Sequence, residues 1–238
     1  MRFLTVSVVS VFALLCVAVP AADARAASSF TASVMTKYDV RAATKAKKAT
    51  VVKKRRSVEL PAIAKGGLLF GDPEAATTIV MFTDIECPFC KRFHKDTYPS
   101  LKKDYIDTGK VRFVIRHFPL AFHPYADRAA RAVVCARAES DEKARSLYES
   151  LIALEQFETG SIKAAAKKAG LDTDDLQTCM EAWSSREAVD KDAETGANAK
   201  VNGTPSFFVI GPTGVSKSVT GAYPFETFEK ALKDVQKK

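Results

Sequence analysis

The sequence predicts an α/β fold in which a helical segment separates two groups of strands. Apolar runs of strand length occur at Thr78–Thr83 and Val111–His117, and a segment with helical spacing lies between them. Strand signals are absent from about residue 123 to residue 200 and return at Ser206–Ile210. Because a strand–helix–strand crossover joins parallel strands, we expect the first two strands to pair in parallel.

The beginning of the chain has the pattern of a secretory signal peptide. Arg2 supplies a positive charge, Phe3–Val19 form an apolar run, and Ala22–Ala26 offer small residues at a cleavage site. An uncleaved membrane anchor is the alternative, because the apolar run approaches spanning length. Cys16 follows two leucines rather than a small residue, which disfavours lipid modification. Residues 1–26 therefore predict an exported protein of the periplasm or cell envelope.

Residues 27–60 form a basic extension with nine Lys/Arg against two Asp/Glu, whereas the chain from Pro61 onward holds 25 of each. This composition favours a solvated, flexible tail. The alternatives are a tether to an anionic envelope surface and an oligomerising helix marked by Phe30, Val34 and Tyr38. Nucleic acid is not an expected partner, because the protein is expected to be exported and no aromatic residue interleaves the basic cluster.

Residues 61–238 are expected to form the main domain. A turn at Gly66–Pro73 leads to the first strand, and the first helix then continues to the helix breaker Gly109. After the second strand, apolar spacing marks four helices, at Ala126–Ala136, Leu147–Leu154, Ile162–Ala169 and Leu176–Trp183. A turn at Gly211–Gly214, a strand to Val219 and a helix over Pro224–Lys237 complete the domain.

Cys87 and Cys90 stand where the first strand meets the first helix. Two intervening residues allow their sulfurs to meet across one helical turn. Backbone N–H groups and the positive end of the helix dipole lower the pKa of a thiol from its usual value of about 8.5. We therefore predict that Cys87 is a redox nucleophile and Cys90 its resolving partner.

Three other uses of this pair fit less well. A zinc site requires four ligands, and only His94 lies near the pair. Haem attachment requires a histidine where Lys91 stands. A purely structural disulfide would close a loop too short to give much stabilisation. No metal or cofactor is expected.

A second feature, Gly203-Thr204-Pro205-Ser206, opens the returning strand. A proline at this place is either an ordinary start of a strand or a cis-proline held for a purpose.

Together these motifs resemble the DsbA-like branch of the thioredoxin superfamily. The resemblance covers about residues 66–236 and rests on the segment Ile79–His94 with its Cys-Pro-Phe-Cys, and on Gly-Thr-Pro-Ser-Phe-Phe. Further matches are Gly71-Asp72-Pro73, Phe118-Pro119-Leu120, His123-Pro124 and Gly221-Ala222-Tyr223.

This resemblance implies a thioredoxin fold with a helical domain inserted between its two halves. It also implies that Pro205 is cis and that Thr204 and Pro205 offer backbone to an extended substrate. We place Pro88 and Phe89 with these substrate-binding residues. The expected substrates are unfolded or cysteine-containing exported proteins, and a membrane partner would renew the disulfide.

Two features depart from the relatives. Many relatives carry a buried acid where this chain has Met81, and Asp84 and Glu86 are doubtful substitutes. Pro88 and Phe89 offer no side-chain donor to Cys87, so the helix end and backbone should supply most of its stabilisation. We expect a less extreme oxidant than relatives with histidine between the cysteines.

Cys135 and Cys179 lie on two different helices of the insertion. Relatives have a comparable second pair, and export favours a structural disulfide. The alternative is two buried free thiols. His94 is expected to be a packing or surface residue, and His117 and His123 are given no catalytic role.

The sequence thus predicts an exported thiol:disulfide oxidoreductase that forms disulfides through Cys87 and Cys90. The first alternative is an oligomeric isomerase or reductase held together by residues 27–60. The second is a non-enzymatic envelope-binding surface protein that uses the same basic segment.

Overall fold

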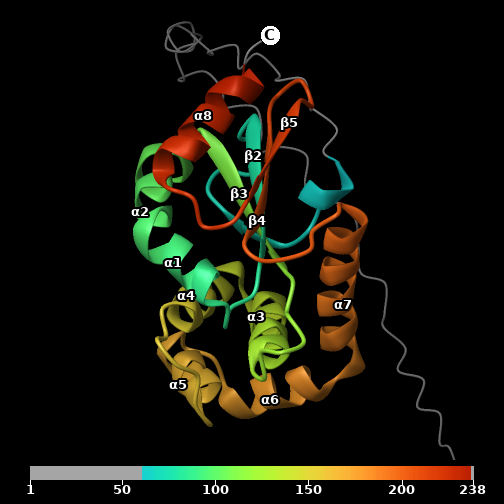
Figure 1. Ribbon diagram of the computed structural model, residues 1–238. Coiled ribbons are helices and arrows are strands. Elements are labelled where there is room, and N and C mark those ends of the chain that lie inside the picture. Colours follow the sequence, from blue (N-terminus) through green and yellow to red (C-terminus); the bar gives the residue numbers. More distant parts are fainter. Residues whose placement is uncertain (1–60, 237–238) are drawn as a thin grey trace, which may run out of the picture. The chain divides into compact units, whose positions relative to one another are not determined.

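A five-stranded mixed sheet with the strand order β1–β3–β2–β4–β5 lies at the centre of the part of the chain described by the computed structural model, residues 61–236 (Figure 1). The strands are β1 (Leu68–Phe70), β2 (Thr77–Thr83), β3 (Val111–His117), β4 (Ser206–Ile210) and β5 (Ser216–Thr220). The expected signal peptide, residues 1–26, and the basic extension, residues 27–60, lie outside the described residues.

The expected parallel crossover is present. Strands β2 and β3 pair in parallel, with Met81 opposite Ile115, and all other strand pairs are antiparallel. Strand β2 is therefore central and buried along its whole length. Its carboxyl end leads directly into the cysteine segment, which joins that segment to the buried central strand of the sheet.

One short strand was missed in the sequence. The predicted turn at Gly66–Pro73 contains β1, which pairs with the middle of β3. Gly67 has a positive φ of 76°, and a Cβ there would lie 2.4 Å from the carbonyl oxygen of Ile115. The glycine is thus required where the chain passes close to β3, and the strand of three residues was too short to give a periodic signal.

The first helix differs from the single helix that the sequence predicted. The chain forms α1 (Pro88–Asp96), α2 (Tyr98–Leu101) and a π-helical turn, η3 (Lys102–Ile106). Pro99 lacks an N–H group and therefore cannot continue the hydrogen-bond ladder of α1. The break at Thr97 follows from this proline, which the apolar spacing does not reveal.

The helical segment is inserted between β3 and β4. It comprises α3 (Ala126–Glu139), α4 (Asp141–Ile152), α5 (Ser161–Lys168), α6 (Thr173–Glu181) and α7 (Trp183–Asn198), and α8 (Phe225–Gln236) follows the last strand. Ser140 and Asp172 cap α4 and α6 by accepting hydrogen bonds from backbone N–H groups of the first turn. No helix within residues 61–236 has both the length and the apolar character needed to cross a membrane.

The fourth predicted helix was too long, and a fifth was missed. Helix α6 ends at Glu181, and Trp183, which is 72% exposed, begins α7 instead of completing an apolar face. Helix α7 buries mostly small or polar residues against β3. Its Asp192 forms a buried ion pair with Arg116 and accepts a hydrogen bond from the backbone N–H of His117 at 3.0 Å.

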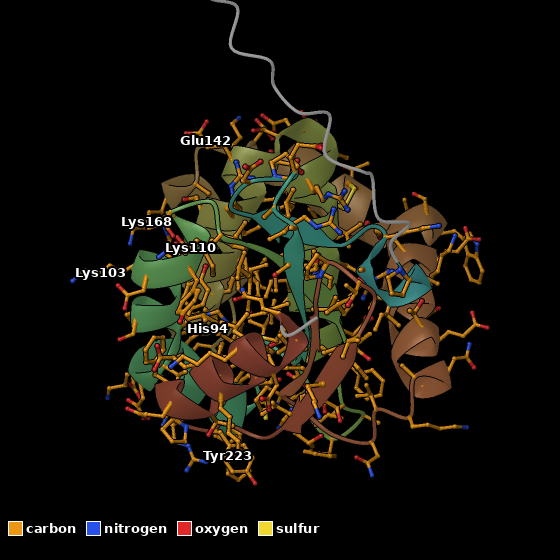
Figure 2. The ribbon with its side chains drawn as sticks, turned by 90° about the horizontal axis from the view of Figure 1, so that it is seen from above. His94, Lys103, Lys110, Glu142, Lys168 and Tyr223 are labelled. Atoms are coloured by element: carbon orange, nitrogen blue, oxygen red, sulfur yellow. A yellow bond between two sulfur atoms is a disulfide. The ribbon has the colours of Figure 1, made fainter. Side chains whose placement is uncertain are left out.

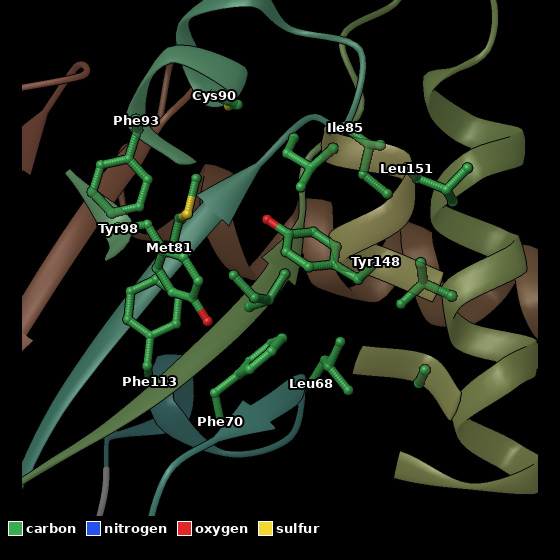
Figure 3. Packing of buried hydrophobic residues seen from close by; sticks show 14 of the residues in the cluster. Leu68, Phe70, Met81, Ile85, Cys90, Phe93, Tyr98, Phe113, Tyr148 and Leu151 are labelled. Carbon is green, nitrogen blue, oxygen red and sulfur yellow. The ribbon is translucent and has the colours of Figure 1, made fainter. Parts of the chain in front are cut away.

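Two hydrophobic cores cover the two faces of the sheet. Alternate residues of β2 divide between them: Ile79 and Met81 join the larger core, and Val80 and Phe82 join the smaller one. The larger core continues from the sheet into the inserted helices through residues such as Tyr148 and Leu151 (Figure 3). The insertion is therefore packed against the sheet end that carries the cysteines.

Candidate active site

Cys87 and Cys90 occupy the first turn of α1, immediately after the central strand. Cys87 is the N-cap residue and Pro88 the first helical residue, a position that proline favours. Both cysteines are free thiols in the structure. Cys87 retains 3% of its surface exposed and Cys90 none, so only the first sulfur is accessible to a reactant from outside.

The environment of Cys87 favours its thiolate and lowers its pKa to about 5. A hydrogen bond from the Cys90 thiol makes the largest contribution, and smaller ones come from Thr204 and from the backbone N–H groups of Cys90 and Phe89. Burial opposes them. The expectation that the helix end and backbone dominate is therefore wrong, because the neighbouring thiol is the stronger donor.

The pKa of Cys90 shifts in the opposite direction. Burial raises its pKa well above 9, and the adjacent Cys87 thiolate raises it further. Thr83 opposes both effects. One sulfur of the pair is thus ionised at neutral pH and the other remains protonated.

The loop before β4 faces this pair. The Thr204–Pro205 peptide bond is cis, and the Sγ of Cys87 lies 3.5 Å from the carbonyl oxygen of Thr204. Pro205 is buried, and its carbonyl oxygen accepts a hydrogen bond from Gly221 N–H at 2.8 Å. The structure therefore brings Cys87, Cys90, Thr204 and Pro205 together, although 114 positions separate Cys90 from Thr204 in the chain.

The two residues between the cysteines point outward. Pro88 and Phe89 are both exposed, and Phe89 has 52% of its surface accessible. The guanidinium group of Arg92 lies 5.0 Å from the centre of the Phe89 ring. This exposed ring is available to an apolar contact beside Cys87.

Sequence reasoning missed a buried brace formed by Asp84. One carboxylate oxygen of Asp84 accepts hydrogen bonds from the N–H groups of Glu86 and Cys87, at 2.8 and 3.2 Å. The other oxygen accepts from Leu120 N–H at 2.8 Å and lies 2.7 Å from Nδ1 of His123. Asp84 thus ties the cysteine turn to the loop that leads into the insertion.

Glu86 adds a second tie to the same loop, since its carboxylate accepts a hydrogen bond from Tyr125 N–H at 2.8 Å. His123, which was given no role, therefore positions the turn through Asp84. The only sequence signal for this contact was the His123-Pro124 match to the DsbA-like pattern.

The other two histidines, His117 and His94, lie on β3 and α1. His117 is buried, and burial lowers its pKa. Nε2 of His94 lies 2.7 Å from the hydroxyl of Tyr148, and burial lowers its pKa to about 3. In Figure 2 Lys103 and Tyr223 lie at the periphery of the fold, while His94 lies toward its middle.

A second cysteine pair lies within the insertion. Cys135 of α3 and Cys179 of α6 form a disulfide that links residues 44 positions apart. The disulfide joins α3 and α6, which correspond to two separate helices predicted from the sequence.

A buried dithiol at the start of a helix, facing a cis-proline loop beside the same strand, is the arrangement found in thioredoxin-fold proteins. The sequence family described as Thioredoxin matches residues 64–234, and the chain belongs to this family. The predicted fold class is confirmed: a thioredoxin fold with a helical domain inserted between its two halves.

Similar proteins include DsbA2 of Pseudomonas aeruginosa, whose crystal structure matches with a TM-score of 0.59 at 26% identity over 76% of this chain and 100% of that one. A putative protein-disulfide oxidoreductase of Rickettsia felis is 26% identical, over 72% of this chain and 62% of its own. The Na⁺/H⁺ antiporter NhaA 3 of Salinispora tropica is 31% identical over 59% of this chain. The chain spans 21% of the antiporter's length, so the match concerns one segment of that protein. The predicted resemblance to the DsbA-like branch is confirmed.

Proposed function

We propose that this chain is an exported thiol:disulfide oxidoreductase that forms disulfides in cysteine-containing exported proteins. The observation that carries the proposal is the unequal state of two adjacent thiols: the pKa of Cys87 is lowered to about 5 and that of Cys90 is raised. A thiolate that is stable at neutral pH is a good leaving group, so Cys87 is readily released when a second substrate thiol attacks the mixed disulfide. The name of the Rickettsia felis relative agrees with this activity.

The reaction begins with the Cys87–Cys90 disulfide. A substrate thiolate attacks the Sγ of Cys87, the bond to Cys90 breaks, and the departing Cys90 sulfur takes up a proton. A second thiolate of the substrate then attacks the substrate sulfur of the mixed disulfide, and Cys87 leaves as a thiolate. The substrate loses two electrons, the cysteine pair gains them, and a membrane partner must remove them again.

The surface around Cys87 suits an extended, unfolded substrate. The backbone of Thr204 and Pro205 would pair with it as an added strand does. Phe89 and Phe122, exposed by 52% and 75%, offer apolar surface, and Phe122 packs against the ring of His123. Such a surface would bind unfolded chains with little regard for sequence.

The expected compartment rests on two features. Residues 1–26 have the pattern of a signal peptide, and the Cys135–Cys179 disulfide suits an oxidising environment such as the periplasm or cell envelope. The proposal includes a membrane partner, because the reduced cysteine pair must be oxidised again after each cycle. An anionic envelope surface as a partner of residues 27–60 is a prediction on residues outside those described.

The proposal is tested by mixing the oxidised full chain with a reduced peptide that contains two cysteines. We expect the peptide to become a disulfide while Cys87 and Cys90 become reduced in equal amount. If the protein fails to oxidise the peptide but reduces insulin, and its cysteine pair is found reduced in the envelope, the reductase alternative replaces the donor. Comparing the mass in solution with and without residues 27–60 tests the oligomeric form of that alternative.

A further inference from the structure

Each cycle of the proposed exchange requires the buried Cys90 sulfur to gain or lose a proton. Cys90 has no exposed surface, and its pKa is raised well above 9. A departing Cys90 thiolate is therefore a poor leaving group unless it is protonated as it leaves. The same proton must be removed before Cys90 can attack a mixed disulfide.

The nearest carboxylates of the turn are already engaged. Both oxygens of Asp84 accept hydrogen bonds from backbone N–H groups, and one also lies against His123. Glu86 accepts from Tyr125 N–H. Met81, on the strand below, is fully buried in the hydrophobic core and supplies no proton-carrying group.

A line of other polar groups leads away from Cys90. The hydroxyl of Thr83, at the end of β2, is buried and has no hydrogen-bond partner among the described residues. It acts on two neighbours, because it lowers the pKa of both Cys90 and the Tyr148 hydroxyl. Thr83 thus lies beside both the Cys90 thiol and the Tyr148 hydroxyl.

The line continues through Tyr148 to His94. Tyr148 is fully buried on α4, and Figure 3 shows its hydroxyl pointing toward the cysteine end of β2. That hydroxyl lies 2.7 Å from Nε2 of His94 on α1. The two residues come from opposite sides of the contact between the sheet domain and the insertion.

His94 borders a groove in the surface. It is only partly buried and lines a groove of about 850 Å³ between α1, α2 and α4. Several carboxylates line the same groove, and water there can exchange protons with the imidazole. Cys87 faces Cys90, and Tyr98 and Glu149 act on Tyr148. The titratable and charged groups that line the groove with His94 are Glu86, Lys91, Arg92, Lys95, Asp96, Tyr98, Lys102, Glu149 and Glu155.

We propose that Thr83, Tyr148 and His94 form a proton relay between Cys90 and this groove. When Cys90 leaves Cys87, it takes the proton of Thr83, Thr83 takes that of Tyr148, and Tyr148 takes one from Nε2 of the imidazole while Nδ1 receives a proton from water. When Cys90 attacks a mixed disulfide, each proton moves one place in the other direction. The histidine changes tautomer and never has to become an imidazolium, which agrees with the low pKa of His94.

The inference rests on the proposed function, and one assay separates the two. The full chain carrying Cys16→Ala, with Cys87 and Cys90 reduced and the Cys135–Cys179 disulfide intact, is mixed with an excess of dithiobis(nitrobenzoate), and the release of coloured thionitrobenzoate is followed. Attack by Cys87 releases one equivalent and forms a mixed disulfide. Attack by Cys90 on that mixed disulfide releases the second equivalent, so the second step reports on the relay alone.

Three variants interrupt the relay while conserving shape. Tyr148→Phe and Thr83→Val each remove one hydroxyl, and His94→Gln keeps an acceptor for Tyr148 but cannot change tautomer. Loss of proton transfer by a positioned group slows a step by about 100-fold, so we expect the second release to slow by about that factor near neutral pH. The first release should change by no more than about twofold.

Two matched controls separate proton transfer from packing. Tyr98→Phe removes another buried hydroxyl, one without a hydrogen-bond partner, from the same aromatic cluster. It should leave both releases unchanged. Thr83→Ser keeps the hydroxyl and should retain a fast second release.

The pH profile provides the last distinction. In Tyr148→Phe the second release should rise by about tenfold per pH unit, because hydroxide alone then removes the proton. The relay is overturned if Tyr148→Phe and Thr83→Val leave the second release unchanged, or if Tyr98→Phe slows it equally. A wild-type chain without a fast first release overturns the proposed function and the relay together.

Discussion

Cys87 and Cys90 lie three residues apart at the end of the sheet, whereas Cys135 and Cys179 lie 44 residues apart on two helices of the insertion. On chain-entropy grounds, closing the longer loop stabilises the fold by about 4 kcal/mol, and closing the short one by about 2 kcal/mol. The short pair also stands beside donors that stabilise one of its sulfurs as a thiolate. A disulfide between Cys87 and Cys90 is therefore suited to repeated opening and closing. The disulfide between Cys135 and Cys179 is suited to a permanent structural role.

This difference is local, since both pairs border the same large core. Reactivity comes from the helix start, the unequal burial of the two sulfurs and the loop at Pro205, which the helical pair lacks. Changes at the two pairs should consequently affect separate properties, and the following predictions test this separation.

The largest expected effect is on activity. Cys87→Ser should abolish oxidation of a dithiol peptide, because no other accessible thiolate lies at the site. Cys90→Ser should still form mixed disulfides at Cys87 but fail to resolve them, so covalent complexes with substrate should accumulate on a non-reducing gel. The double variant Cys135→Ala/Cys179→Ala should retain the wild-type rate within about twofold. Loss of activity in that control would mean that the two pairs are coupled.

Stability should show the opposite ranking. Cys135→Ala/Cys179→Ala should lower the free energy of unfolding of the oxidised protein by about 4 kcal/mol, measured by urea denaturation without reductant. Cys87→Ala/Cys90→Ala should lower it by about 2 kcal/mol or less under the same conditions. Equal losses from the two double variants would contradict the contrast in loop length.

The sequence revealed the active cysteine turn because its chemistry is local. The spacing of Cys87 and Cys90, the apolar strand before them and the motif at Pro205 all lie in short segments with clear patterns. Their contact across the sheet followed from the family resemblance. The Asp84–His123 contact could not be read in this way, because it depends on how one loop folds back over another.

The helix and the strand that were not predicted from the sequence lack regularly spaced apolar residues. Helix α7 contacts the sheet through the Asp192–Arg116 ion pair and small residues, so its buried face looks polar in the sequence. Its first residue, Trp183, is exposed although its type suggests a core. Strand β1 is held by backbone pairing over three residues, and side-chain patterns carry little information on so short an element.

The pH dependence of stability should distinguish the reduced active pair. The pKa of Cys87 is about 5 in the folded protein and about 9 in the unfolded chain, so the unfolded state binds more protons between these values. The free energy of unfolding of the reduced protein should therefore rise from pH 5 toward pH 9, relative to reduced Cys87→Ser, and the difference should vanish as the pH falls below 5. Denaturation at several pH values measures this. A difference that does not change with pH would contradict a stabilised thiolate.

The smallest expected change tests what limits the oxidising strength of the active pair. Phe89 lies between the cysteines, its side chain has no hydrogen-bond donor, and it is 52% exposed, so a polar ring can replace it without disturbing the core. Phe89→His should add a donor to the Cys87 thiolate, stabilise the reduced form by about 1.4 kcal/mol and make the potential about 30 mV more oxidising. Equilibration with glutathione buffers, followed by alkylation of free thiols, measures the shift. Phe89→Leu is the matched control, because it changes the ring without adding a donor, and it should leave the potential unchanged. If Phe89→His and Phe89→Leu shift the reduction potential equally, the ring at position 89 acts through packing around Cys87. The stabilisation of the Cys87 thiolate would then come from the backbone and Cys90 alone.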